Sequence, residues 1–209
     1  FNTDQEQKKH FYELYEEYLK EHSYLDFDDL LLKTVSLFEK SERIRNKWAS
    51  RFQYILVDEF QDTNDIQYRL LKYMVNEDTS LFVVGDPDQT IYTWRGANIK
   101  LIMNFNLDFK GVEDIKLEKN YRSTQKILDA ANTLIKENHN RLEKDLYSDN
   151  NEGGKPKFFD AENSEKEAEF VVNKILDLRG QGYDYKDIAL LYRSSYYTRN
   201  FEQALMKRK

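Results

Sequence analysis

Two acidic residues, Asp58 and Glu59, directly follow an apolar run at residues 54–57, and this stretch has the clearest capacity for chemistry in the chain. Four apolar residues without polar alternation are typical of a strand that is covered on both faces, as in a parallel sheet flanked by helices. Ligands of such sheets bind beyond the carboxyl ends of the strands, where these two carboxylates fall. One carboxylate can hold a divalent metal, usually through water, while the other polarises a nucleophilic water. Both acids are therefore candidate metal ligands at a hydrolytic site.

The same stretch has a simpler interpretation. Asp62, Thr63 or Asn64 would cap a helix that runs from Ile66, because short polar side chains accept hydrogen bonds from the free backbone N–H groups of a helix start. The two acids would then be merely solvated. Taken alone, the stretch does not separate these interpretations.

A second apolar run, at residues 81–84, is also followed by an acid, Asp86, and then by a polar loop that contains Gln89. The helical pattern at 66–75 has the length of a crossover between parallel strands. We therefore expect the two apolar runs to be neighbouring parallel strands, with Asp58 and Gln89 close together at their carboxyl ends.

Three longer segments carry a family resemblance. They are VDEFQDTN at 57–64, VVGDPDQTIYTWRGA at 83–97 and LEKNYRS at 117–123. In this order and at this spacing they resemble motifs II, III and IV of the UvrD/Rep/PcrA-type superfamily 1 DNA helicases, with the PcrA branch nearest. Each segment is long enough that chance is a poor explanation of all three, and a less specific match covers nearly the whole chain.

The resemblance implies an α/β fold: an incomplete P-loop NTPase (RecA-like) motor domain with a parallel sheet, joined to the start of a second RecA-like domain. Residues 1–118 would be the C-terminal part of the first motor domain, with residual helices from its inserted subdomain. Residues 119–209 would be the N-terminal part of the second.

The resemblance also assigns roles in ATP hydrolysis. Asp58 would hold the Mg²⁺ of bound ATP, Glu59 would orient or activate the attacking water, and Gln89 would sense the γ-phosphate. From the second domain, Tyr121 would lie against the adenine and Arg122 would act as an arginine finger. A lone Tyr-Arg pair before a helix is ordinarily a surface pair, and only the other two motifs favour this role.

Single-stranded DNA contacts are implied for Tyr92, Trp94 and Arg95, with Trp94 stacking on a base. Stacking is indifferent to base identity because every base has a π-face. A tryptophan is more often part of a core. The position of Trp94 in a polar loop, beside Arg95 and Gly96, favours a platform for DNA instead.

The remaining pattern predicts alternating helices and strands. Helices are expected at 4–22, 26–39, 41–51, 98–108, 124–138 and 164–179 and from about 195, strands at 113–117, 156–160 and 188–192, and an exposed loop at 139–155.

Composition narrows the classes of function. The chain of 209 residues has a formal charge of −6 and a pI near 5.3, which argues against nucleic-acid binding through a broad basic surface. It has no cysteine, which excludes disulfides and thiolate metal sites, and its histidines, His10, His22 and His139, are scattered. No apolar segment approaches transmembrane length, so we expect a cytoplasmic protein without membrane partners.

The predicted function is that of an internal fragment of an ATP-dependent 3′–5′ DNA helicase that acts on single-stranded DNA and duplex junctions in repair or replication. No G-x-x-x-x-G-K-[ST] motif is present, so the fragment holds half of an ATP site, is expected to bind ATP and Mg²⁺ poorly and is expected to be inactive alone. One alternative is a non-catalytic DNA-binding or interaction module, which would have no reason to keep Asp58, Glu59, Gln89 and Arg122 together. Another is the helicase subunit of a recombination helicase–nuclease.

Overall fold

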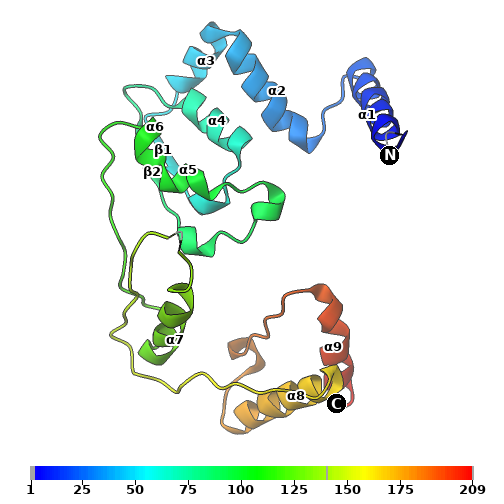
Figure 1. The fold of residues 1–209 in the computed structure, drawn as a ribbon, viewed down its shortest axis with the longest axis vertical. Coiled ribbons are helices and arrows are strands. Elements are labelled where there is room, and N and C mark those ends of the chain that lie inside the picture. The colour runs from blue at the N-terminus through cyan, green and yellow to red at the C-terminus, as the bar shows by residue number, and fades with distance from the viewer. Residues whose placement is uncertain (1–2, 140, 209) are drawn as a thin grey trace. The chain divides into compact units, whose positions relative to one another are not determined.

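The computed structural model describes residues 3–139 and 141–208. The chain divides into two compact units, with the boundary between Asn151 and Glu152 (Figure 1). The first unit contains the sheet and all three motifs that carry the family resemblance, so it positions the candidate site.

Two short strands, β1 (Tyr54–Val57) and β2 (Ser80–Val83), pair in parallel, with Ile55 opposite Leu81 and Val57 opposite Val83. This confirms the expected neighbouring parallel strands. Backbone hydrogen bonds continue past the strand ends, from Val84 N to Val57 O (2.8 Å) and from Phe60 N to Val84 O (2.9 Å). The segments that follow the two strands are therefore fastened to each other where the candidate acids begin.

The helices of the first unit have clear local causes. Asp26 caps α2 (Phe27–Lys40) by accepting a hydrogen bond from Asp29 N (2.8 Å). Asn64 caps α4 (Asp65–Met74) in a reciprocal arrangement with Gln67, so the cap expected from the simpler interpretation exists and does not involve Asp58 or Glu59. In chain order the helices are α1 (Thr3–Glu21), α2 (Phe27–Lys40), α3 (Glu42–Ala49), α4 (Asp65–Met74), α5 (Ile99–Met103), α6 (Phe105–Asp108) and α7 (Gln125–Ile135), with the 3₁₀ helices η1 (Phe60–Asp62), η2 (Pro87–Gln89) and η3 (Thr93–Arg95).

The core beside the sheet is built on Phe60, Tyr68 and Leu71. Phe60 is 1% exposed and meets the rings of Tyr68 and Phe105 edge to face, with centroids 6.0 and 5.4 Å away. Because Phe60 directly follows Glu59, its burial anchors the acidic segment. The partly buried strand residues packed against this core are Ile55, Val57, Leu81 and Val83.

The opposite face of the sheet is exposed, which corrects the expectation of strands covered on both faces. Tyr54 and Leu56 are 72% and 74% exposed, and Phe82 is 55% exposed. Successive side chains of a strand point to opposite faces, and the described core covers only one of them. The apolar runs are therefore half buried in this chain.

The second unit is helical. It contains α8 (Ser164–Gly180) and α9 (Thr198–Met206), which pack against each other, and the 3₁₀ helices η4 (Tyr185–Asp187) and η5 (Ser195–Tyr197). Its buried apolar side chains are Ala168, Val172 and Phe201. The ring of Phe159 stacks on that of Phe170, with centroids 3.8 Å apart.

Several predicted elements differ in the structure. The segments 113–117, 156–160 and 188–192 are not strands, because an extended segment becomes a strand only by pairing and β1 and β2 are the only laddered strands in the described part of the chain. The helix expected at 98–108 is interrupted at Asn104, which ends α5 and precedes α6. None of the described helices is long and apolar enough to cross a membrane.

Candidate active site

Asp58 and Glu59 are exposed at the carboxyl end of β1. Glu59 has left-handed backbone angles (φ 49°, ψ 43°), which are costly for a residue with a side chain and concentrate at functional sites. Asp58 Oδ1 accepts a hydrogen bond from Glu59 N (2.9 Å). This turn sends Phe60 into the core and leaves both carboxylates at a cavity of about 440 Å³, whose other walls include Val57 and Gln67.

A buried glutamine, Gln61, connects the ends of the two strands. Its side-chain amide nitrogen donates to Glu59 Oε2 (2.7 Å), and its oxygen accepts from Asp86 N (3.0 Å). Gln61 is 2% exposed, so a lost partner could not be replaced freely by water. The amide therefore fixes the Glu59 carboxylate relative to the loop that follows β2. Sequence reasoning did not single out Gln61, although it lies inside the first motif.

Gln89 is joined to the same series of contacts. Asp86 caps η2 by accepting from Asp88 N (3.0 Å), and its second oxygen accepts from the Gln89 side-chain amide (2.8 Å). A continuous hydrogen-bonded series thus runs from Glu59 through Gln61 and Asp86 to Gln89. It links two of the predicted catalytic side chains across the end of the sheet.

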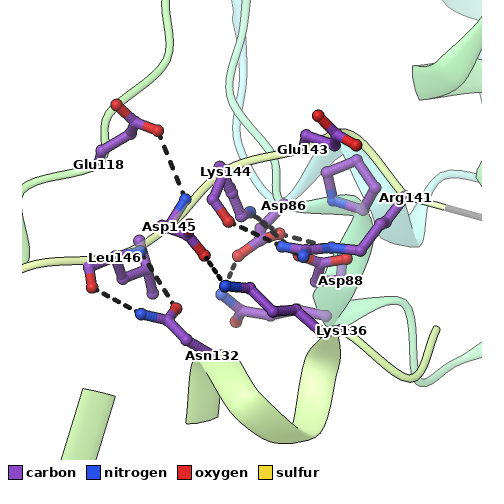
Figure 2. A network of polar contacts seen from close by, with 12 residues as sticks. Asp86, Asp88, Glu118, Asn132, Lys136, Arg141, Glu143, Lys144, Asp145 and Leu146 are labelled. Carbon is purple, nitrogen blue, oxygen red and sulfur yellow. Dashed lines mark hydrogen bonds and ion pairs between the residues drawn. The ribbon is translucent and has the colours of Figure 1, made fainter. Parts of the chain in front are cut away.

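Two cationic side chains from the stretch 139–155 form ion pairs with the acids of the loop that follows β2 (Figure 2). Lys144 forms an ion pair with Asp86, and Arg141 Nη2 lies 3.1 Å from Asp88 Oδ2. Burial by itself would raise the pKa of Asp86, but hydrogen bonds from Lys144 and Gln89 outweigh it and hold that pKa below its ordinary value. The stretch expected to be an exposed loop therefore carries largely buried cations. These contacts span 53 and 58 positions, and no local sequence signal could have matched the partners.

The predicted DNA-contacting side chains lie together at η3: Trp94 and Arg95 belong to it, and Tyr92 directly precedes it. Trp94 is 72% exposed, so it is not part of the core that this chain forms. The guanidinium carbon of Arg95 lies 4.5 Å from the Trp94 ring centroid and 5.2 Å from that of Tyr92. The segment is held to the end of the first motif by the hydrogen bond from Asn98 N to Thr63 O (3.0 Å). The structure thus presents an aromatic and cationic surface on a segment that is bonded to the end of the first motif.

Tyr121 and Arg122 are exposed, and their backbone is fixed by Asn120. Asn120 Oδ1 accepts from Arg122 N (3.0 Å) and from Ser123 N (2.8 Å). Lys119 Nζ lies 5.3 Å from the centroid of the Tyr121 ring. Among the described residues, no hydrogen bond or ion pair joins the Arg122 guanidinium to Glu59 or Gln89. The structure therefore does not bring the predicted arginine finger to the acids.

The donor set suits a nucleotide-bound Mg²⁺ better than a metal held by protein alone. No group of three or more His, Cys, Asp or Glu side chains that could hold a metal occurs at residues 3–139 or 141–208. Mg²⁺ commonly binds through one or two carboxylates together with phosphate oxygens and water. The exposed carboxylates of Asp58 and Glu59 fit that incomplete protein contribution.

Comparison with known proteins agrees with the motifs. Residues 2–110 match the family model for the UvrD/REP helicase N-terminal domain, and residues 115–209 match that for the UvrD-like helicase C-terminal domain. The chain therefore belongs to the UvrD/REP helicase family.

Curated bacterial proteins are similar over almost the whole chain. A probable DNA helicase II homolog from Mycoplasma capricolum is 44% identical over 95% of this chain, and ATP-dependent DNA helicase PcrA from Leuconostoc citreum is 41% identical over 99%. PcrA from Staphylococcus aureus is 43% identical over 94%. The chain spans only 27–28% of the length of these relatives.

The close packing of Gly85 against Gln61 allows a test of the position of the Gln61 side chain. A Cβ added at Gly85 would lie 2.8 Å from Gln61 Oε1 and 3.1 Å from Gln61 N, closer than van der Waals contact allows. We expect Gly85→Ala to lower the free energy of unfolding by about 1 to 3 kcal/mol, the usual cost of overpacking. Urea unfolding of the 209-residue chain measures this.

The matched control is Gly154→Ala, because a Cβ there meets nothing within 4 Å. Its effect should stay within about 0.5 kcal/mol, as for other surface substitutions. Equal stability of the two variants would show that Gln61 does not occupy the space beside Gly85.

Proposed function

We propose that the chain is an internal segment of an ATP-dependent 3′–5′ DNA helicase (the parent protein), which couples ATP hydrolysis to movement along single-stranded DNA and to duplex unwinding. The observation that carries this proposal is the hydrogen-bonded series from Glu59 through Gln61 and Asp86 to Gln89 at the carboxyl ends of two parallel strands. The names of the relatives, which include ATP-dependent DNA helicases, support it, and the polarity follows from the motif resemblance.

In this proposal the acids at the end of β1 divide the work of hydrolysis. Asp58 holds Mg²⁺, which when bound neutralises charge on the nucleotide phosphates. Glu59 orients the attacking water and accepts its proton. Gln61 donates to Oε2 of Glu59 (2.7 Å), which leaves Oε1 for the water and restricts the carboxylate to one orientation. Positioning of this kind supplies much of the catalysis in phosphoryl transfer.

Gln89 and Arg122 act on the transferred phosphoryl group. Gln89 donates one N–H of its amide to Asp86 (2.8 Å), which orients the side chain and leaves the second N–H as a donor for the γ-phosphate. Arg122, whose guanidinium has no bond to the acids among the described residues, reaches the phosphate through closure of the second motor domain and stabilises the charge that develops there. Tyr121 lies against the adenine in the same closed state.

DNA binding is local, in keeping with the net charge of −6. Trp94 offers an exposed ring for base stacking, and Arg95 places a cation over that ring and beside the strand. A platform of this kind takes any base, as a motor that moves along DNA regardless of sequence requires.

Two further observations support a segment of two RecA-like motor domains. The exposed apolar face at Tyr54, Leu56 and Phe82 is suited to cover by other parts of the parent protein. We place the domain boundary near residue 118, which is supported by family matches that end at 110 and resume at 115. The boundary between the two compact units falls later, after Asn151. The reason is that residues 141–150 are bonded to earlier parts of the chain, for example Arg141 to Asp88 and Asn150 to Tyr121.

The DNA platform is tested by Trp94→Ala in the parent protein. The variant should bind single-stranded DNA more weakly by about 1 to 3 kcal/mol, the usual value of one base stack, with little dependence on base sequence. Titration of labelled oligonucleotides measures the affinity. Tyr196→Ala, which removes another exposed ring (82% exposed), is the control and should leave the affinity unchanged. Unchanged DNA affinity for Trp94→Ala would remove Trp94 from the DNA site.

The arginine finger is tested by Arg122→Ala in the parent protein. Because such a group acts on charge that develops during transfer, kcat should fall by roughly 10³-fold or more while single-stranded DNA affinity stays nearly intact. Steady-state ATPase with and without DNA gives kcat. Arg43→Ala removes another exposed arginine, on α3, and should leave kcat unchanged. A kcat within a few-fold of wild type for Arg122→Ala would remove this residue from the site.

A further inference from the structure

Residues 141–150 (the bridging segment) contact two parts of the proposed site. At its start, Arg141 and Lys144 reach the acids of the loop after β2 (Figure 2). Lys144 pairs with Asp86, and its Nζ also lies 3.7 Å from Asp88 Oδ2. Arg141 Nη2 additionally donates to the backbone carbonyl of Lys144 (2.9 Å), so Arg141 also holds the backbone from which Lys144 extends.

These ion pairs are largely removed from solvent. The side chains of Arg141 and Asp88 are each 9% exposed, and those of Lys144 and Asp86 are 18% and 24% exposed. Removing one partner of a buried pair leaves an uncompensated charge, which costs much more than losing a surface pair. The contact is therefore sensitive to the loss of either cation.

The Arg141–Asp88 ion pair is held by one hydrogen bond and not by the two that an arginine and a carboxylate can form. Arg141 Nε and Asp88 Oδ1 are both buried and have no hydrogen-bond partner among the described residues. They belong to the two members of one ion pair that is held through a single nitrogen and a single oxygen. In a bidentate arginine–carboxylate pair both of these atoms would be bonded.

The far end of the bridging segment is bonded to the motif that carries Arg122. Tyr147 N donates to Glu118 O (3.0 Å), and Asn120 N donates to Tyr147 O (2.7 Å). The Asn150 side-chain amide donates to the carbonyl oxygens of Tyr121 (3.3 Å) and Ser123 (3.2 Å). Between the two ends, Leu146 exchanges two hydrogen bonds with the Asn132 side chain on α7, as Figure 2 shows.

A connected path therefore joins Gln89 to the backbone of Arg122. Asp86 is the shared acceptor, since one of its oxygens binds the Gln89 amide and the other binds Lys144. Asn120 is the shared residue at the other end, because it bonds both Tyr147 and Arg122 N.

We propose that Arg141 and Lys144 are positioning residues for ATP hydrolysis, which fasten the Gln89 loop of the first motor domain to the Arg122 motif of the second. This inference rests on the proposed function. The cations hold Asp86 and Asp88 in place, Asp86 in turn positions Gln89, and the bridging segment transmits that position to Arg122.

The test uses steady-state ATPase of the parent protein. Lys144→Ala and Arg141→Ala should each lower DNA-stimulated kcat by roughly 10²-fold, the usual effect of a small misplacement of catalytic groups, with single-stranded DNA affinity unchanged. The control is Lys136→Ala. Lys136 also pairs with the bridging segment, at Asp145 (3.0 Å), but both side chains are exposed and neither touches the loop after β2. Its kcat should match wild type.

A double-mutant cycle separates positioning from mere structural support. If Lys144 acts through Gln89, adding Lys144→Ala to a Gln89→Ala parent should reduce kcat by less than about threefold further. A structural role would instead multiply the two losses. Charge exchange gives a second readout: Arg141→Asp and Asp88→Arg should each lose activity, and the two together should recover most of it.

Failure of the proposed function and failure of the inference on Arg141 and Lys144 give different results. A wild-type parent without DNA-stimulated ATPase would overturn the proposed function and this inference with it. An active wild type with normal kcat in Lys144→Ala and Arg141→Ala, or multiplicative losses in the cycle, would overturn the inference alone. If Lys144→Ala does not fold, Lys144→Gln, which removes the charge but keeps a hydrogen-bonding side chain, serves in the same cycle with the same expected result.

Discussion

The buried amide of Gln61 is the contact on which the rest of the proposed site depends. It uses its donor on Glu59 and its acceptor on Asp86 N, and it joins the carboxyl ends of β1 and β2. An unsatisfied buried amide costs about 1 to 3 kcal/mol, so the two partners are held in one arrangement. The neighbouring residues serve this contact: Phe60 anchors the segment in the core, and Gly85 leaves the space that the amide fills.

Charge explains how the loop after β2 can lie beside a proposed nucleotide. Four carboxylates, those of Asp58, Glu59, Asp86 and Asp88, follow the two strands, and a bound triphosphate would add more negative charge. The ion pairs with Arg141 and Lys144 compensate Asp86 and Asp88. Asp58 and Glu59 remain exposed for Mg²⁺ and water. The two carboxylates that are paired with cations have structural roles in the proposal, and the two exposed ones have the chemical roles.

Sequence patterns predicted the elements that depend on local information. The apolar runs gave β1 and β2 within one residue, and the polar residues before Ile66 gave the cap of α4. The segments 113–117, 156–160 and 188–192 were mistaken for strands because strand formation depends on a partner elsewhere in space. Burial on both faces of β1 was wrong for the same reason, since neighbouring elements decide which strand face is covered.

The contacts within the candidate site were also not predictable from local sequence. The motifs pointed to Asp58, Glu59 and Gln89 as candidates, but their residue types do not reveal that Gln61 and Asp86 connect Glu59 to Gln89. Arg141 and Lys144 lie in a polar stretch that is indistinguishable from a solvated loop, and their partners are 53 and 58 positions away. Contacts of this range are fixed by tertiary packing, which a local pattern does not encode.

The proposed activation of water by Glu59 in ATP hydrolysis is tested most directly by Glu59→Gln in the parent protein. The substitution keeps the size and a hydrogen-bonding oxygen but removes the base. DNA-stimulated kcat should fall by roughly 10²- to 10⁴-fold, the usual contribution of general base catalysis, with ATP affinity retained. Steady-state ATPase together with equilibrium nucleotide binding measures both. A kcat within a few-fold of wild type would show that Glu59 is not the base that activates the water.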